Sequence, residues 1–183
     1  HGYINNLTTT TLNSNSITLS GINLVSTPGN LYYVGANGDD TKTGTHPQDP
    51  YLTVAKALSV ATAGDTVYVY PGTYQEVFPL TIPAGVAVKG TGLRSVKITP
   101  TAGTNTNDAI YLNGESTLED LTIADFYYDS SNDTGYAFKF ANNMLVTSRS
   151  PYLRNLTILT KGSVTSASDP RGFDQNDAGR GAF

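Results

Sequence analysis

Two stretches of the chain, Leu118-Glu-Asp-Leu-Thr-Ile123 and Leu153-Arg-Asn-Leu-Thr-Ile158, repeat one pattern 35 positions apart. A second short apolar stretch precedes each of them, Asp108–Leu112 in the first case and Gly135–Phe140 in the second. A unit of two short strands cannot bury its apolar face alone, so such units are expected to stack on one another. The repeat therefore predicts an all-β chain whose parallel strands stack coil upon coil, as a parallel β-helix.

The repeat also predicts which residues lie over one another, on rungs about 4.8 Å apart. Three apolar pairs should stack in the core: Leu118 with Leu153, Leu121 with Leu156, and Ile123 with Ile158. Asp120 and Asn155 should stack near a bend of the chain. Glu119 and Arg154 should be neighbours on the outer face, where an ion pair is favourable but weak. A third copy is expected to begin at Gly181-Ala-Phe183.

Upstream of the repeat, short alternating segments separated by turn residues predict more strands, at 31–34, 66–70, 79–82, 86–89 and 96–99. One helix is predicted over Leu52–Ala61, because four residues fall on one face and Gly64 stands just past its end: Leu52, Ala55, Leu58 and Ala61. The open end of a β-helix exposes core and backbone groups. The helix comes just before the first coil, where a cap is needed.

Residues 1–27 form a Thr/Ser/Asn-rich arm in which apolar residues recur every five positions, at Leu7, Leu12, Ile17 and Ile22. This extended arm has too few apolar groups to fold alone and needs a partner surface. One interpretation is a fibre shaft in which three chains share their apolar stripes; the other is an arm that lies on its own domain. Residues 28–183 are then expected to be the N-terminal part of a β-helix domain, cut off at its C-terminal end.

The amino-acid composition excludes several classes of binding partner and structural feature. Apolar residues make up 38% of the chain and charged residues only 14%, so polarity comes mainly from Ser, Thr, Asn and Gly. The net charge is -4, which offers no basic face to nucleic acid. The chain has no cysteine, which excludes disulfides and Cys-based zinc sites. No apolar run reaches the length of some 18 residues that membrane insertion needs.

The stretch from Leu31 to about Ile98 carries three motifs in a fixed order. These are Tyr32-Tyr-Val-Gly-Ala-Asn-Gly-Asp-Asp40, Pro50-Tyr-Leu-Thr-Val-Ala-Lys-Ala-Leu58 and Ala63-Gly-Asp-Thr-Val-Tyr-Val-Tyr-Pro-Gly-Thr-Tyr-Gln-Glu76. The order resembles the start of pectate-lyase-like β-helix domains and covers about a third of the chain. The resemblance implies a right-handed parallel β-helix with an N-terminal capping helix, but no catalytic motif of that superfamily carries over. The arm is similar in style to the repeat-rich arms of phage tail and fibre proteins.

Catalytic roles can be tested against structural ones. A lyase of this class needs calcium on clustered carboxylates and a basic residue to take a proton, for which Asp120, Asp125 and Arg154 are candidates. A hydrolase needs two carboxylates about 5–9.5 Å apart, for which Glu119, Asp120 and Asp125 are candidates. The structural alternative is a ladder of Asp120 on Asn155, with Arg154 balancing Glu119. We favour that alternative, and no catalytic residue is assigned.

Acidic residues also occur in the loop before the helix, at Asp39, Asp40 and Asp49. Their oxygens could bind a cation, but such Asp residues more often serve loop hydrogen bonds and helix caps. No metal and no cofactor is therefore expected.

Aromatic side chains suggest one binding site. Phe126, Tyr127 and Tyr128 begin the long loop between repeat units, next to Asp125, and could stack on sugar rings. Other residues of the loop could bind hydroxyl groups: Asp129, Asn132 and Asp133. The alternative is contact with a neighbouring subunit, or packing of the loop on its own coil.

Two further segments have structural interpretations. Tyr68, Tyr70 and Tyr74 are predicted to be outward-facing residues of alternating strands. The segment Ser163–Gly181 is too long for a tight turn and is predicted to be a loop that is functional, partner-bound or mobile.

These observations favour a structural component of a virion: a tail, baseplate or fibre protein whose β-helix rod contributes to host attachment. The expected partners are other copies of the chain, as a trimer, other virion proteins and a cell-surface glycan. Two alternatives stay open. The chain could be the N-terminal part of a secreted polysaccharide lyase or hydrolase, or a glycan-binding adhesin without chemistry.

Overall fold

A computed structural model of the chain describes residues 18–19, 22–23, 29–140 and 150–160. Within the arm, β1 (Thr18–Leu19) and β2 (Ile22–Asn23) pair as an antiparallel ladder. Several predictions fall outside the described residues: the pentad positions 7, 12 and 17, the loop at 163–181 and the third copy of the repeat at 181–183.

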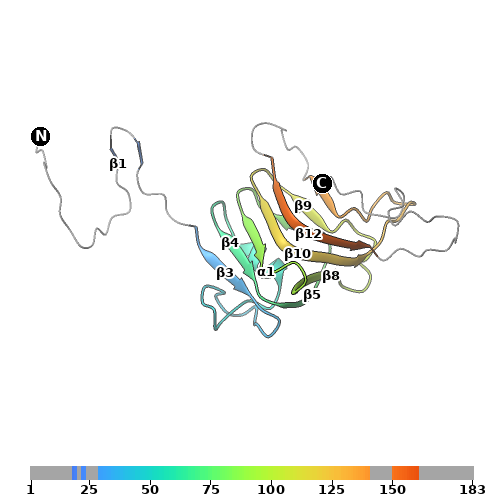
Figure 1. Ribbon diagram of the computed structural model, residues 1–183, viewed down its shortest axis with the longest axis horizontal. Helices are drawn as coiled ribbons and strands as arrows, with labels where there is room; N and C mark the ends of the chain where they lie inside the picture. The colour runs from blue at the N-terminus through green and yellow to red at the C-terminus, as the bar shows by residue number, and fades with distance from the viewer. Residues whose placement is uncertain (1–17, 20–21, 24–28, 141–149, 161–183) are drawn as a thin grey trace, which may run out of the picture.

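In the part of the chain that the structure describes, the remaining strands all pair in parallel, and the fold is mostly β with one short helix (Figure 1). The elements are β3 (Leu31–Val34), α1 (Val54–Val60), β4 (Thr66–Val69), β5 (Gly72–Glu76), β6 (Leu80–Ile82), β7 (Ala87–Gly90), β8 (Val96–Pro100), β9 (Ile110–Leu112), β10 (Thr117–Phe126), β11 (Phe138–Phe140) and β12 (Tyr152–Thr160).

Three ladders of strands show how the chain winds. The first contains β3, β4, β7 and the first halves of β10 and β12. The second contains β5, β8 and the second halves of β10 and β12, and the third contains β6, β9 and β11. Each pass of the chain therefore adds one strand to each ladder in turn, as in a parallel β-helix. The prediction of stacked parallel strands is confirmed.

The predicted register between the repeats is also confirmed. β10 and β12 pair with Leu118 against Leu153, Leu121 against Leu156 and Ile123 against Ile158. The core lies between the ladders and is built from inward-facing aliphatic residues, such as Val67, Val88 and Leu118, which are in register on three successive coils.

The chain turns from the first ladder to the second at a single residue on each later coil. Asp120 and Asn155 have φ angles of 60° and 50°, in the left-handed region that Asp and Asn tolerate better than most residues. Asn155 Nδ2 donates a 2.6 Å hydrogen bond to Asp120 Oδ1, so the predicted stacking is confirmed. On the preceding coil, a Cβ on Gly90 would lie 2.2 Å from the Asp120 carbonyl oxygen, so only glycine fits there.

Strand β5 was not predicted, because the sequence suggested only a turn at Pro71–Gly72. The alternation of inward and outward residues changes phase at this corner. Tyr68 and Tyr70 are partly exposed, as predicted for outward residues, but Tyr74 is only 3% exposed and its hydroxyl donates to the Tyr70 carbonyl at 2.7 Å. The prediction that Tyr74 faces outward is therefore wrong.

The helix α1 is shorter than predicted, and of the four residues predicted on its packed face Leu58 and Ala61 are buried. It begins after Thr53, whose Oγ1 accepts a hydrogen bond from Lys56 N at 3.1 Å. Its buried residues are Val54, Ala57 and Leu58. Leu52, predicted on the packed face, precedes the helix and is 44% exposed, and Ala55 is also exposed. Val54 and Ala57 occupy the positions in the core that Leu52 and Ala55 were predicted to fill.

The N-terminus of α1 is held by a buried acid. Glu76 of β5 is 2% exposed and accepts hydrogen bonds from Val54 N at 2.6 Å and Ala55 N at 3.2 Å. Burial raises the pKa of Glu76, although both amides oppose the rise.

Within the described residues, no helix has the length and apolarity that crossing a membrane requires.

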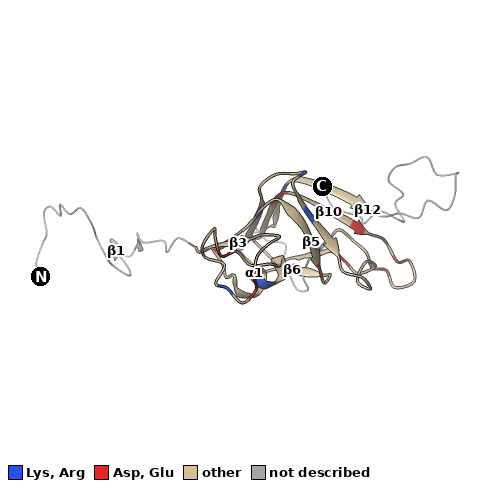
Figure 2. Ribbon diagram, turned by 90° about the horizontal axis from the view of Figure 1, so that it is seen from below, with Lys and Arg blue, Asp and Glu red and all other residues tan. Residues whose placement is uncertain are grey.

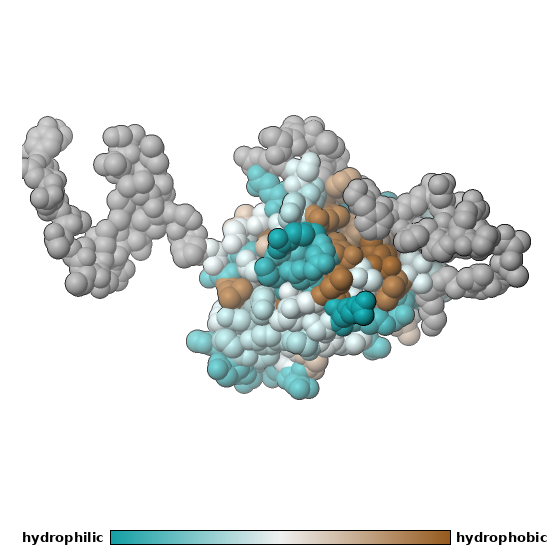
Figure 3. Space-filling model, viewed as in Figure 1, coloured by the Kyte–Doolittle hydropathy of each residue, from teal (hydrophilic) through white to brown (hydrophobic). Residues whose placement is uncertain are grey.

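The last described coil is less well covered than the others. Leu153, Leu156 and Ile158 are only partly buried, and Phe140, Tyr152 and Leu159 are more than half exposed. Figure 3 shows apolar side chains gathered on the half of the molecule where β10 and β12 lie.

Candidate functional site

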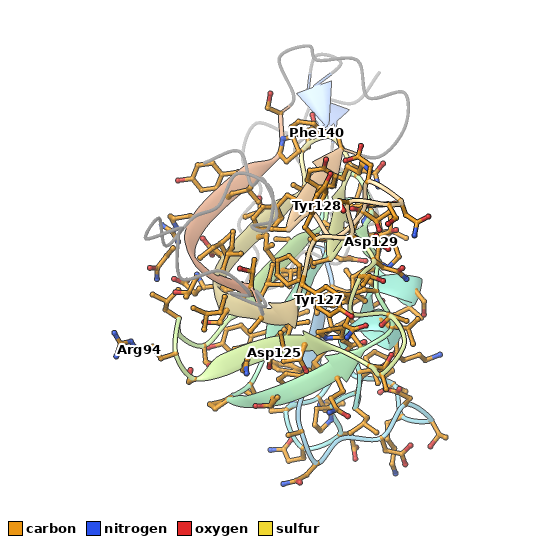
Figure 4. All side chains as sticks on the ribbon, turned by 90° about the vertical axis from the view of Figure 1, so that its right-hand side faces the viewer. Arg94, Asp125, Tyr127, Tyr128, Asp129 and Phe140 are labelled. Carbon is orange, nitrogen blue, oxygen red and sulfur yellow. The ribbon has the colours of Figure 1, made fainter. Side chains whose placement is uncertain are left out.

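The three candidate aromatic side chains at the end of β10 differ in burial: two are partly exposed and one lies in the core. Tyr127 and Tyr128 are partly exposed at the start of the loop 127–136 (Figure 4). Phe126 is fully buried, with its ring packed edge-on against Phe78 at 6.4 Å between centroids. The prediction that Phe126 stacks on a sugar is therefore wrong. The cause is the φ angle of 64° at Asp125, which shifts the strand's alternation and turns Phe126 into the core.

Tyr128 meets a second tyrosine at the other end of the loop. The rings of Tyr128 and Tyr136 lie edge to face, 5.6 Å apart between centroids. Both hydroxyls donate to Oδ1 of Asp133, that of Tyr128 at 2.8 Å. The hydrogen bond to Asp133 is the main reason that the pKa of Tyr136 rises to about 12. Tyr136 is therefore a neutral phenol at physiological pH.

A buried carboxylate fixes this loop to the coils. Asp108 is 2% exposed, and its Oδ1 accepts from the backbone N–H groups of Gly135 and Tyr136, both at 3.1 Å. Its Oδ2 accepts from the Tyr111 hydroxyl at 3.0 Å and from Lys139 Nζ at 3.1 Å. The Lys139 ammonium also lies 5.1 Å from the centre of the Tyr136 ring, a cation–π contact. Hydrogen bonding to Asp108 raises the pKa of Lys139.

Sequence reasoning missed Asp108, Tyr111, Tyr136 and Lys139 as neighbours of the loop. A signal was present, because Asp108–Leu112 and Gly135–Phe140 were recognised as matching strands. Tyr111 and Lys139 occupy the same outward position on β9 and β11 and are partners in register. Matching strands in a stacked repeat place such residues one rung apart.

The other candidate polar residues have partners within the fold: Asp129 and Asn132 bind each other in the loop, and Asp125 of β10 binds a lysine of β8. Asp129 accepts from Ser131 N at 2.9 Å and from Asn132 Nδ2 at 2.8 Å, and the Asn132 bond is the main cause of its lowered pKa. Asp125 forms an ion pair with Lys97 Nζ at 2.6 Å. Figure 4 shows Tyr127, Tyr128 and Asp129 along one flank, with Asp125 further along the coils and Arg94 projecting at the edge.

The carboxylates considered for catalysis have separate structural partners. Glu119 accepts from Lys89 Nζ at 2.8 Å and forms an ion pair with Arg154. The Lys89 contact is the main cause of the lowered pKa of Glu119. Asp120 accepts from Asn155, as described above. The two predicted contacts, Asp120 with Asn155 and Arg154 with Glu119, are therefore confirmed.

The acids of the first loop serve backbone geometry. Asp39 Oδ1 accepts from the N–H and hydroxyl of Thr41. Asp40 accepts from Leu52 N at 2.8 Å, and from both N–H and hydroxyl of Thr53. Among the described residues, no group of three His, Asp or Glu side chains could hold a metal ion.

Comparison with known proteins gives one family. Residues 36–161 match the model of the family described as Protein of unknown function (DUF1565). No curated protein sequence matches the chain.

Several solved structures are similar at low identity. They include a rhamnogalacturonan lyase (TM-score 0.43, 18% identity, 53% of this chain), a mutant of a PL6 family alginate lyase (0.48, 16%, 76%) and a mutant pectin methylesterase in complex with a hexasaccharide (0.46, 15%, 70%). The matched regions span 29%, 18% and 49% of those chains, respectively.

Proposed function

This chain belongs to the DUF1565 family, and we propose that it is a structural module of a larger surface assembly, with its coils serving as a rigid rod. The assembly we propose is a virion tail, baseplate or fibre. The observation that carries this proposal is the pairing of outward charged side chains with one another across rungs. In the described residues, these side chains are used to tie coils together.

The clearest example spans three coils. Lys89, Glu119 and Arg154 are in register on β7, β10 and β12, and the Glu119 carboxylate binds both cations. Each exposed ion pair contributes little, about 0–1 kcal/mol. A ladder of such pairs, with the Asp120–Asn155 bond beside it, resists sliding of one coil over the next. Figure 2 shows charged residues scattered among mostly uncharged ones, which suits a rod better than a charged binding face.

The finer features of the rod follow from the resemblance to pectate-lyase-like domains. We propose that the coils are right-handed, as nearly all parallel crossover connections are. We also propose that α1 caps the first coil, supported by the burial of Val54, Ala57 and Leu58 in the core. The arm, residues 1–27, would join three chains and connect the rod to other virion proteins.

The trimer is tested by removing the apolar stripe of the arm in the full chain. The variant carries Leu7→Ser, Leu12→Ser, Ile17→Ser and Ile22→Ser. Light scattering should give a mass near three times 19.4 kDa for the wild type and near one chain for the variant, because the shared apolar stripe is lost.

A matched control changes Thr8, Thr9, Thr10 and Thr11 to Ser, which keeps every apolar position, and it should remain trimeric. Circular dichroism should show the same β content in all three proteins. A wild-type chain that is monomeric at all concentrations would contradict the proposal.

A second candidate function is glycan binding by the loop 127–136. The supporting observation is its preorganisation: Tyr128 and Tyr136 share Asp133, and Asp108 anchors the loop's end to β9. Rigid tyrosines bind with little loss of conformational entropy. In this proposal the chain contacts a cell-surface glycan during host attachment and carries out no chemistry on it.

The glycan proposal predicts that the double variant Tyr127→Ala, Tyr128→Ala loses at least about tenfold in affinity, equivalent to about 1.4 kcal/mol. Binding should be measured by calorimetry against acidic and neutral oligosaccharides. Tyr152→Ala is the control, because Tyr152 is exposed on β12, outside the loop. Unchanged affinity in the double variant, or no binding by the wild type, would remove the loop as a glycan site.

A further inference from the structure

The first strands of the rod carry a group of aromatic residues that neither proposal above uses. Tyr33 on β3, Tyr68 on β4 and Tyr70 just after β4 pack together, with ring centroids 5.8–6.3 Å apart. All three rings are partly exposed. Leu31, two residues before Tyr33 on the same side of β3, is 41% exposed. We call these four residues the tyrosine patch.

The hydroxyls of the patch have no partner within the part of the chain that the structure describes. Four other tyrosines differ, because each donates a hydrogen bond: Tyr74, Tyr111, Tyr128 and Tyr136. The patch therefore offers aromatic area together with three hydroxyls that are available to water or to a partner.

The patch is uncharged, and the coil beside it is charged. Lys89 is in register with Tyr68 on the next rung, but its ammonium is bound to Glu119. Protein–protein interfaces are enriched in tyrosine and depleted of charged residues at their centre. The composition of the patch is that of an interface centre.

The position of the patch indicates its partner. β3 is the first strand of its ladder, and residues 29–30 lead directly into it from the side of the arm in the sequence. Only residues 24–30 separate the end of β2 from Leu31, a span of at most about 29 Å. If the arms of different copies associate, each tyrosine patch is held within this distance of the associated arms. The effective concentration of one patch relative to another is then of order millimolar.

We propose that the tyrosine patch is a contact surface between copies of this chain, at the base of the arm. This inference rests on the proposed association through the arm and adds a second surface to it. The rings of one copy cover those of another, and the hydroxyls bond across the interface.

Distances between labels in the full chain test this contact. The protein has no cysteine, so a single introduced thiol can carry a spin label. Thr66→Cys places the label at the patch, because Thr66 is in register with Leu31. Thr81→Cys is the matched control, exposed on β6 in the third ladder. Pulsed electron resonance should give a shorter distance between copies from Thr66→Cys than from Thr81→Cys.

The variant Tyr68→Thr tests the contact without a label. It removes an outward ring and keeps a residue suited to strands. We expect the concentration of half-dissociation to rise at least about tenfold, with unchanged circular dichroism.

The outcomes separate the two proposals. An oligomer whose Thr66→Cys distance is no shorter than its Thr81→Cys distance overturns the patch and leaves the arm. A monomer overturns both. A neutral oligosaccharide that binds the wild type but not Tyr68→Thr, with equal distances at both labels, assigns the patch to a sugar and also overturns the proposal.

Discussion

Phe126→Ala is expected to lower the free energy of unfolding by about 3–5 kcal/mol, because it leaves a cavity in a closed part of the core. The Phe126 side chain is fully buried, and its ring packs against Phe78, which is also buried. The effect belongs to stability and is independent of any ligand.

Chemical unfolding of the full chain measures the loss, with Tyr127→Ala as the matched control. Tyr127 is the next residue along and is partly exposed, so its truncation should change the free energy of unfolding by less than about 0.5 kcal/mol. If the two variants were equally stable, Phe126 would not be a core residue and its place among the sugar-binding candidates would be restored.

Glu76→Ala should destabilise the fold by about 2–6 kcal/mol. The substitution leaves two backbone N–H groups at the start of α1, those of Val54 and Ala55, without their acceptor. An unsatisfied buried donor costs about 1–3 kcal/mol. Glu76→Gln, which keeps one acceptor oxygen, should lose less than Glu76→Ala, and the same unfolding measurement ranks them.

The pH dependence of the Glu76→Gln comparison has a definite sign. Burial raises the folded-state pKa of Glu76 above the ordinary value of 4.5, so the folded chain binds this proton more tightly than the unfolded chain. The stability from this group is fully present below the unfolded pKa and is lost as pH rises through the folded pKa.

The stability of the wild type relative to Glu76→Gln should therefore increase as pH falls from 7 towards 4.5. Subtracting the free energy of unfolding of Glu76→Gln from that of the wild type removes the contributions of other titrating groups, some of which depend on pH in the opposite direction. Asp65 is one of them: its burial favours a raised pKa, but hydrogen bonds from Thr62 and Asn30 outweigh this and lower it. A difference that is flat with pH would show that Glu76 titrates alike in both states.

The internal repeat allowed the strand register of the later coils to be predicted from sequence. The earlier strand β5 could not be predicted, because the pattern of buried residues there is irregular. Leu118 to Ile123 and Leu153 to Ile158 have matching spacing, so register and bend followed from sequence. Strand β5 was missed because its inward residues include an acid, Glu76, and because the phase of alternation changes after Tyr70. Buried acids and phase changes are tertiary features that strand patterns do not carry.

The position of the candidate loop was predicted correctly, but one of the aromatic residues assigned to it was not. Tyr127 and Tyr128 lie on it with partly exposed rings, whereas Phe126 lies in the core. The left-handed backbone at Asp125 decides between these outcomes, and an Asp in a strand does not reveal its φ angle. Asp108 was missed because the loop returns to it only through the coil geometry.

The one-residue bend has a consequence for how this chain can change over evolution. Asp120 and Asn155 each form a bend of a single residue, and the Asp120 carbonyl leaves no room for a side chain at Gly90 on the preceding coil. An inserted residue at Asp120 would swap the buried and exposed sides of the second half of β10. The connection between β10 and β11 is different, because it contains the ten loop residues 127–136, which belong to neither strand. Insertions and deletions should therefore accumulate at that corner, which lets homologues diversify a surface loop while the wall of the rod keeps its frame.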